Sequence, residues 1–149
     1  MSITRRTLLI SAPLAFAFAG ASRAMTSPIY VEDGIAVDGS DVVAYFTQSK
    51  PVAGSVDFSY DWMGAKWLFS SAENRDMFAA DPEAYAPQFG GYCAYAVSQG
   101  YTAPTVPEAW TVYDGKLYLN FSLRAQELWS QDIPGNIAKG NENWPGVLN

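Results

Sequence analysis

The only cysteine of the chain stands where its side chain could do chemistry. Cys93 follows Gly90, Gly91 and Tyr92, and residues 92–98 are expected to form a short helix. Free backbone N–H groups at the start of a helix stabilise a thiolate, which favours a reactive thiol. The two glycines allow the backbone to approach a ligand closely or to adopt a positive φ. These four residues are therefore our first candidates for a functional site.

Two kinds of chemistry fit a lone thiol. Cys93 could cycle through a sulfenic acid or a mixed disulfide that an external thiol reductant resolves, since the chain holds no second cysteine. Alternatively, its thiolate could bind a soft metal ion such as Cu(I), assisted by the thioether of Met63 or Met77. The competing interpretation is that Cys93 is a small apolar core residue, because free cysteines are among the most buried residue types. The sequence leaves these alternatives open.

Three further residues are weaker candidates for a ligand pocket. Asp41 could hold a polar group there, although capping a turn is the more common role of such an aspartate. Asn74 lies in a predicted helix and could orient the glycine loop. Tyr45 could line a cleft together with other aromatic side chains, although aromatic residues at such spacings more often belong to the core.

The composition removes several classes of function. The 149 residues include no histidine, which excludes Ser-His-Asp and Cys-His catalytic groups, histidine-ligated zinc and haem held by an axial histidine. A net charge of −6 argues against nucleic acid as a partner, since such binding needs clustered lysine and arginine. The sequence contains no phosphate-binding glycine loop or dinucleotide motif that would indicate a nucleotide cofactor. A hydrolase is disfavoured because no evident base activates a nucleophile.

The first 24 residues resemble an export signal. Arg5 and Arg6 form a pair like that of twin-arginine signals, and residues 8–21 are an apolar, uncharged run that is too short to span a bilayer. Small residues suit cleavage after Ala21 or after Ala24, and we favour the second site. We therefore expect a periplasmic or otherwise exported protein.

Removal of this segment would change the net charge of the domain that remains, residues 25–149. The signal carries three arginines and no acidic residue, so the net charge would fall from −6 to −9. No cysteine follows the apolar run, so we expect no lipid anchor and no stable membrane anchor after cleavage. The partner is then a periplasmic protein, a thiol reductant or a small ligand.

The remaining pattern predicts an α+β fold with a small antiparallel sheet built from hairpins. Alternating residues predict hairpins over residues 58–69 and 109–121, the second with an Asp-Gly turn. Helix-start signals precede four helical segments, namely a capping box at Ser70, Asp81-Pro82, Ser122 and Pro134. Residues 42–46 fit either a strand or a helical turn. Strands paired locally with interspersed helices are typical of one α+β domain.

Several short motifs resemble the YHS domain family, and most closely its exported (seleno)protein branch. They occur in the family's order, at residues 41–46 (DVVAYF), 67–74 (WLFSSAEN), 78, 81–87 (DPEAYAP) and 90–95 (GGYCAY). The resemblance covers about residues 30–148 and implies a small α+β fold related to treble-clef-like, metal-binding domains. It implies no settled activity. In relatives of this branch the position of Cys93 can be selenocysteine, which suggests chemistry at that atom.

The chain also departs from its metal-binding relatives. Those domains carry cysteines near the positions of Val43 and of Phe69 or Ser71, and relatives of this branch often have histidine where Tyr60 stands. One thiolate and no imidazole cannot form a four-ligand zinc site. We therefore expect an exported YHS-like protein that uses Cys93 in thiol redox or in copper-type metal handling. The alternative is a non-catalytic binding module in which Cys93 is core packing.

Overall fold

The computed structural model describes residues 26–149, which have the expected α+β fold. The proposed export signal and both cleavage positions lie outside the described residues. Within the described part, no helix combines the length and the apolar character needed to cross a membrane.

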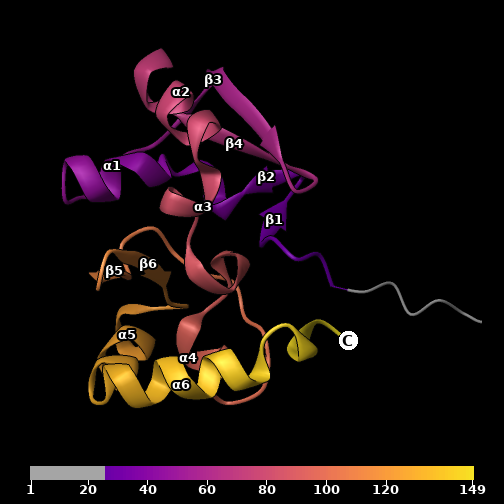
Figure 1. Ribbon diagram of the computed structural model, residues 1–149, viewed down its shortest axis with the longest axis vertical. Helices are drawn as coiled ribbons and strands as arrows, with labels where there is room; N and C mark the ends of the chain where they lie inside the picture. Colours follow the sequence, from indigo (N-terminus) through magenta and orange to yellow (C-terminus); the bar gives the residue numbers. More distant parts are fainter. Residues whose placement is uncertain (1–25) are drawn as a thin grey trace, which may run out of the picture.

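A four-stranded sheet forms one part of the fold, with the order β1-β2-β4-β3 (Figure 1). Its strands are β1 (Val31–Glu32), β2 (Ile35–Ala36), β3 (Ser55–Trp62) and β4 (Ala65–Phe69). The β3–β4 hairpin confirms the predicted pairing over residues 58–69. However, β2 pairs with β4 in parallel, so the expectation of a wholly antiparallel sheet was wrong. Two helical segments, Val37–Gly39 and Val42–Thr47, lie between β2 and the β3–β4 hairpin. The parallel strands β2 and β4 are therefore joined by a crossover, as parallel strands require.

A separate hairpin joins β5 (Trp110–Tyr113) to β6 (Lys116–Leu119), as predicted. Each of the three hairpins turns through two residues with positive φ, at Asp33-Gly34, Met63-Gly64 and Asp114-Gly115. Two successive positive φ angles characterise the type I′ turn, whose twist matches that of the flanking strands. The local sequence therefore determines where each hairpin closes.

The helices begin at polar caps. They are α1 (Val42–Thr47), α2 (Ala72–Ala80), α3 (Pro82–Tyr85), α4 (Ala94–Ser98), α5 (Leu123–Ser130) and α6 (Ile133–Asn143). Residues 42–46 are thus helical, with Asp41 as the N-cap. The α2 cap is Ser71, whose hydroxyl accepts a hydrogen bond from the Asn74 N–H, so the predicted cap at Ser70 was wrong by one residue. The Ser70 hydroxyl instead donates to Asp41.

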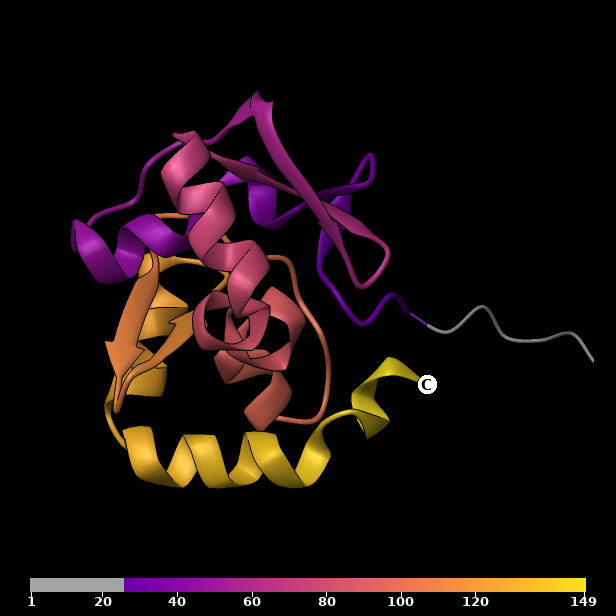
Figure 2. The ribbon, with the colours of Figure 1, turned by 45° about the horizontal axis from the view of Figure 1, so that its top comes forward.

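The described part of the chain also has three short 3₁₀ segments, η1 (Val37–Gly39), η2 (Gln88–Gly91) and η3 (Gly146–Leu148). Of these, η2 lies between α3 and α4. In Figures 1 and 2, α1 and α2 lie beside the four-stranded sheet, whereas α6 runs along the opposite edge of the molecule, next to α4. One contiguous apolar core links these parts, and it includes the fully buried indoles of Trp67 and Trp129. The segment from η2 to α4 therefore crosses the middle of the domain and places Cys93 there.

Candidate functional site

Cys93 is the N-cap residue of α4. Its Sγ accepts a hydrogen bond from the Ala96 N–H at 3.5 Å, and its S–H donates to Oδ1 of Asn120 at 3.4 Å. Its own backbone N–H donates to the Ala103 carbonyl at 3.0 Å. The side chain is only 1% exposed. The expected position at a helix start is confirmed, and the thiol is held by bonds on two sides.

Asn120 is the partner that sequence reasoning missed. Its Oδ1 also accepts from the Tyr95 N–H at 3.0 Å, which identifies this atom as the oxygen of the carboxamide. Its Nδ2 is buried and has no hydrogen-bond partner within residues 26–149. A buried donor without a partner costs about 1–3 kcal/mol, so this amide is poised to donate. An asparagine directly after a strand is typical of a turn, and nothing in the sequence connects it with Cys93.

An apolar pocket of about 390 Å³ lies over Cys93, between α4 and α5. Tyr95, Tyr101, Phe121 and Leu128 supply much of its lining, and Arg124 is the one charged side chain among the described residues that line it. Arg124 forms an exposed ion pair with Glu127 at 3.1 Å. The contiguous apolar core contains Tyr92 and Ala94 but not Cys93. Cys93 is therefore a lining residue of the pocket that is buried as deeply as the core residues.

The glycine pair bends the chain around its own N-terminal region. Gly90 and Gly91 have φ of +65° and +85°, as the sequence suggested. A Cβ on Gly90 would overlap the carbonyl oxygen of Pro28, and one on Gly91 would overlap Val37. The close approach allowed by these glycines is therefore to residues of the same chain. It positions the segment that leads into Cys93.

Tyr92 also holds the segment that leads into Cys93 against the N-terminal residues of the described chain. Its hydroxyl donates to the Ser27 carbonyl at 2.7 Å, and its ring lies 5.9 Å from that of Tyr30. Burial raises the pKa of the Tyr92 hydroxyl, so the bond persists through neutral pH. The geometry gives Tyr92 a positioning role beside Cys93, and its ring does not line the pocket over the thiol.

Asp41 and Asn74 lie together in a separate polar cluster. The fully buried Asp41 carboxylate accepts five hydrogen bonds, two from the start of α1, two from Ser70 and one from Nδ2 of Asn74. This arrangement is that of a structural cap that joins α1 to α2. Asn74 bonds to Asp41 rather than to the glycine loop. Neither residue lines the pocket over Cys93.

Tyr45 is packed into the core of the domain. Its side chain is 1% exposed, its hydroxyl donates to the Pro107 carbonyl at 2.9 Å, and its ring lies 5.4 Å from that of Trp110. Burial raises the pKa of Tyr45 to about 12, and the carboxylates of Glu108 and Asp38 act in the same direction. Tyr45 therefore supports the fold from a position outside the pocket over Cys93.

Ionisation of Tyr45 is expected to destabilise the protein above pH 10. The folded state binds this proton more tightly than the unfolded chain, so its contribution is complete below pH 10 and is lost as the pH rises towards about 12. Two pKa units correspond to about 2–3 kcal/mol of unfolding free energy. Urea unfolding between pH 8 and 11.5 should show this loss, and Tyr45→Phe should reduce its slope. Part of the loss should remain in that variant, because burial also raises the pKa of Tyr92 and Tyr118. A Tyr45→Phe variant with an unchanged slope would contradict the assignment.

The two candidate thioethers lie apart from the thiol. Met63 is 51% exposed in the β3–β4 turn, and Met77 packs on the core from α2. Neither lines the pocket over Cys93. Within residues 26–149, no cluster of three or more Asp, Glu, Cys or His side chains could hold a metal ion. The thioether ligands that we considered for Cu(I) therefore do not surround Cys93.

Comparison with known protein families, with curated proteins and with solved structures finds no match to this chain.

Proposed function

We propose that the protein is an exported, YHS-like domain in which Cys93 is a redox-active thiol that reacts with a small molecule bound in the apolar pocket. One observation carries the proposal. Cys93 lines a pocket of about 390 Å³, and its sulfur is hydrogen-bonded to a helix N–H and to a carboxamide whose Nδ2 has no partner among residues 26–149. A concave apolar site with a few polar groups is the usual form of a small-molecule site.

The chemistry that we assign to the pocket is reduction of an organic hydroperoxide. The Cys93 thiol first gives its proton to water, and the thiolate then attacks the terminal hydroxyl oxygen of the hydroperoxide. An S–O bond forms, the O–O bond breaks, and the leaving alkoxide takes a proton from water to become an alcohol. Sulfur is oxidised to a sulfenic acid while the peroxide is reduced. Asn120 Nδ2 belongs to the carboxamide that contacts Sγ, and its free N–H groups can donate to the new sulfenic oxygen.

The cycle closes with an external thiol because the chain contains one cysteine. A first thiol displaces the sulfenic oxygen as water and forms a mixed disulfide with Cys93. A second thiol then attacks this disulfide, releases the Cys93 thiol and leaves as part of a small disulfide. The net reaction consumes one hydroperoxide and two thiols and yields one alcohol, one water and one disulfide.

We expect Cys93 to be oxidised preferentially by an apolar hydroperoxide. The aromatic and aliphatic lining can bury part of such a molecule. The ratio of the oxidation rate with cumene hydroperoxide to the rate with hydrogen peroxide should therefore be at least about tenfold higher for Cys93 than for free cysteine. The measurement is the rate of sulfenic acid formation, followed by dimedone trapping and mass spectrometry on residues 25–149. Cys93 is the sole thiol, so Cys93→Ser should trap nothing.

A pocket-filling variant tests the role of the lining. Ala125 lies on α5 in the pocket wall, so Ala125→Phe should remove the preference for cumene hydroperoxide. Ala138→Phe is the matched control, because Ala138 is an exposed residue of α6 outside this lining. Reaction of Cys93 no faster than free cysteine with both peroxides would refute the redox proposal. Tight, Cys93-dependent binding of one Cu(I) would replace it with metal handling.

The second candidate function is a non-catalytic binding module. It is favoured by the 1% exposure of Cys93 and by the exposed rings of Tyr101 and Phe121 beside the pocket, each 54% exposed. In that case Cys93→Ala should lower the unfolding free energy without changing the binding of an apolar probe such as 8-anilinonaphthalene-1-sulfonate. The redox proposal expects the peroxide reaction to be lost in this variant.

A further inference from the structure

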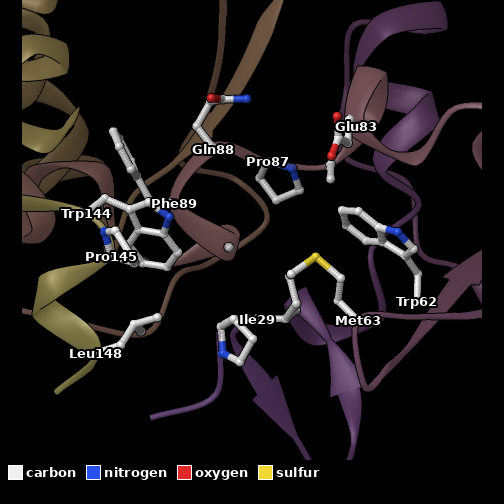
Figure 3. A pocket seen from close by; sticks show the side chains of 13 residues that line it. Ile29, Trp62, Met63, Glu83, Pro87, Gln88, Phe89, Trp144, Pro145 and Leu148 are labelled. Atoms are coloured by element: carbon white, nitrogen blue, oxygen red, sulfur yellow. The ribbon is translucent and has the colours of Figure 1, made fainter. Parts of the chain in front are cut away.

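A second pocket, of about 520 Å³, lies where the β3–β4 turn approaches η2 and the C-terminal end of the chain. Figure 3 shows Trp62, Met63 and Glu83 on one side of this pocket and Phe89 and Trp144 on the other. The segments that meet here are far apart in the sequence. The pocket shares no lining residue with the one over Cys93.

The two indoles of this pocket are held by aromatic neighbours. Trp62 packs edge-to-face on Phe78 at 5.8 Å and 87°, and Trp144 lies 6.0 Å from Phe89. Both indoles are half-buried, so each also presents surface outside the core. Their positions are set by the fold, and a ligand would meet them with little loss of side-chain freedom.

Charge distinguishes this pocket from an ordinary apolar hollow. Among the described residues that line it, Glu83 carries the one charged side chain, and no lysine or arginine is present. Glu83 is exposed and forms no ion pair within residues 26–149. Its carboxylate is thus free to attract a positive charge that enters the pocket.

We propose that this pocket binds an organic cation of the quaternary ammonium type. The faces of aromatic rings attract a cation through their quadrupole, and indole does so best among the side chains. The Met63 thioether, whose sulfur points to the open centre in Figure 3, adds a polarisable, uncharged surface suited to methyl groups. One carboxylate balances the charge. A bare metal ion is a poor fit because this lining offers a single carboxylate and no histidine or cysteine.

The test compares two probes of equal shape. Choline and 3,3-dimethylbutan-1-ol differ in that a carbon of the alcohol replaces the charged nitrogen. Titration of residues 25–149, followed by calorimetry and tryptophan fluorescence, should show choline binding at least about tenfold more tightly. Glu83→Gln should weaken choline binding about fivefold, and Trp144→Leu about tenfold or more. Glu83 is exposed, so its replacement should leave the fold intact.

The matched control is Glu73→Gln, which removes the same charge from an exposed residue of α2 that does not line the pocket. It should leave choline binding within about twofold of the unaltered protein, because Glu73 does not line the pocket and salt weakens the effect of an exposed charge. Equal binding of the neutral probe, equal effects of the two Glu→Gln changes, or no choline binding up to about 50 mM would overturn the proposal. Cys93→Ser should not affect choline binding, which separates this site from the redox proposal.

Discussion

Replacing Gly90 with alanine is expected to lower the free energy of unfolding by more than about 3 kcal/mol. The backbone there has φ of +65°, and an added Cβ would overlap the Pro28 carbonyl oxygen and lie 3.3 Å from the indole of Trp144. The Gly90 carbonyl also accepts the Tyr30 N–H at 2.9 Å, so the two segments cannot separate without losing that bond. Because the overlapping atoms of Pro28 are backbone atoms, no side-chain rotation can relieve this overlap.

Gly115→Ala isolates the part of this loss that comes from φ alone. Gly115 has φ of +74°, and nothing lies within 4 Å of the position of its Cβ. The expected loss there is about 1–2 kcal/mol, the cost of a left-handed conformation for a residue with a side chain. Urea unfolding followed by circular dichroism measures both variants. Similar losses in the two would show that the contact between η2 and Pro28 is not tight.

The features that could be predicted are those determined by residues close together in the sequence. The Asp114-Gly115 turn required nothing beyond two residues that tolerate positive φ between alternating strands, and the structure has this turn. Ser122 likewise caps α5 through the Ala125 N–H, as predicted. Such signals act over three or four positions, so the surrounding fold has little chance to override them.

The predictions that were wrong depended on contacts far along the chain. Ser70 and Ser71 both stand before α2, and the sequence could not show that Asp41, 29 positions earlier, would take the hydroxyl of Ser70. That bond leaves Ser71 as the cap. The parallel pairing of Ile35 with Lys66 was missed for the same reason, because the sequence of one short strand does not indicate which distant strand it pairs with.

For the candidate site, the sequence predicted only the features that depend on neighbouring residues. The sequence placed Cys93 at a helix start, but its bond to Asn120 spans 27 residues and arises because Asn120, directly after β6, lies against the start of α4. Gly90 and Gly91 do have positive φ, whereas their close neighbours are Pro28 and Val37 rather than a ligand. The pocket that Glu83 lines was missed altogether, because it combines segments that only the fold brings together.

Asp41→Asn is expected to cost about 3 kcal/mol or more of unfolding free energy, although it changes one atom of the side chain. Both carboxylate oxygens face donors: Oδ1 accepts from the N–H groups of Val43 and Ala44, and Oδ2 accepts from Ser70 and Asn74. An amide NH₂ at either position points a donor at other donors. Since Asp41 is fully buried, water cannot relieve the mismatch.

The matched control for Asp41 is Asp132→Asn. Asp132 also caps a helix, but it is exposed and accepts one bond, from the Gly135 N–H at 3.1 Å. Because asparagine caps a helix as well as aspartate does, the expected cost there is below about 0.5 kcal/mol. Urea unfolding of both variants gives the comparison, and thermal melts cover the case in which Asp41→Asn is too unstable for a folded baseline. A loss below about 1 kcal/mol at Asp41 would mean that its donors find other partners, and that α1 and α2 are joined mainly by apolar contact.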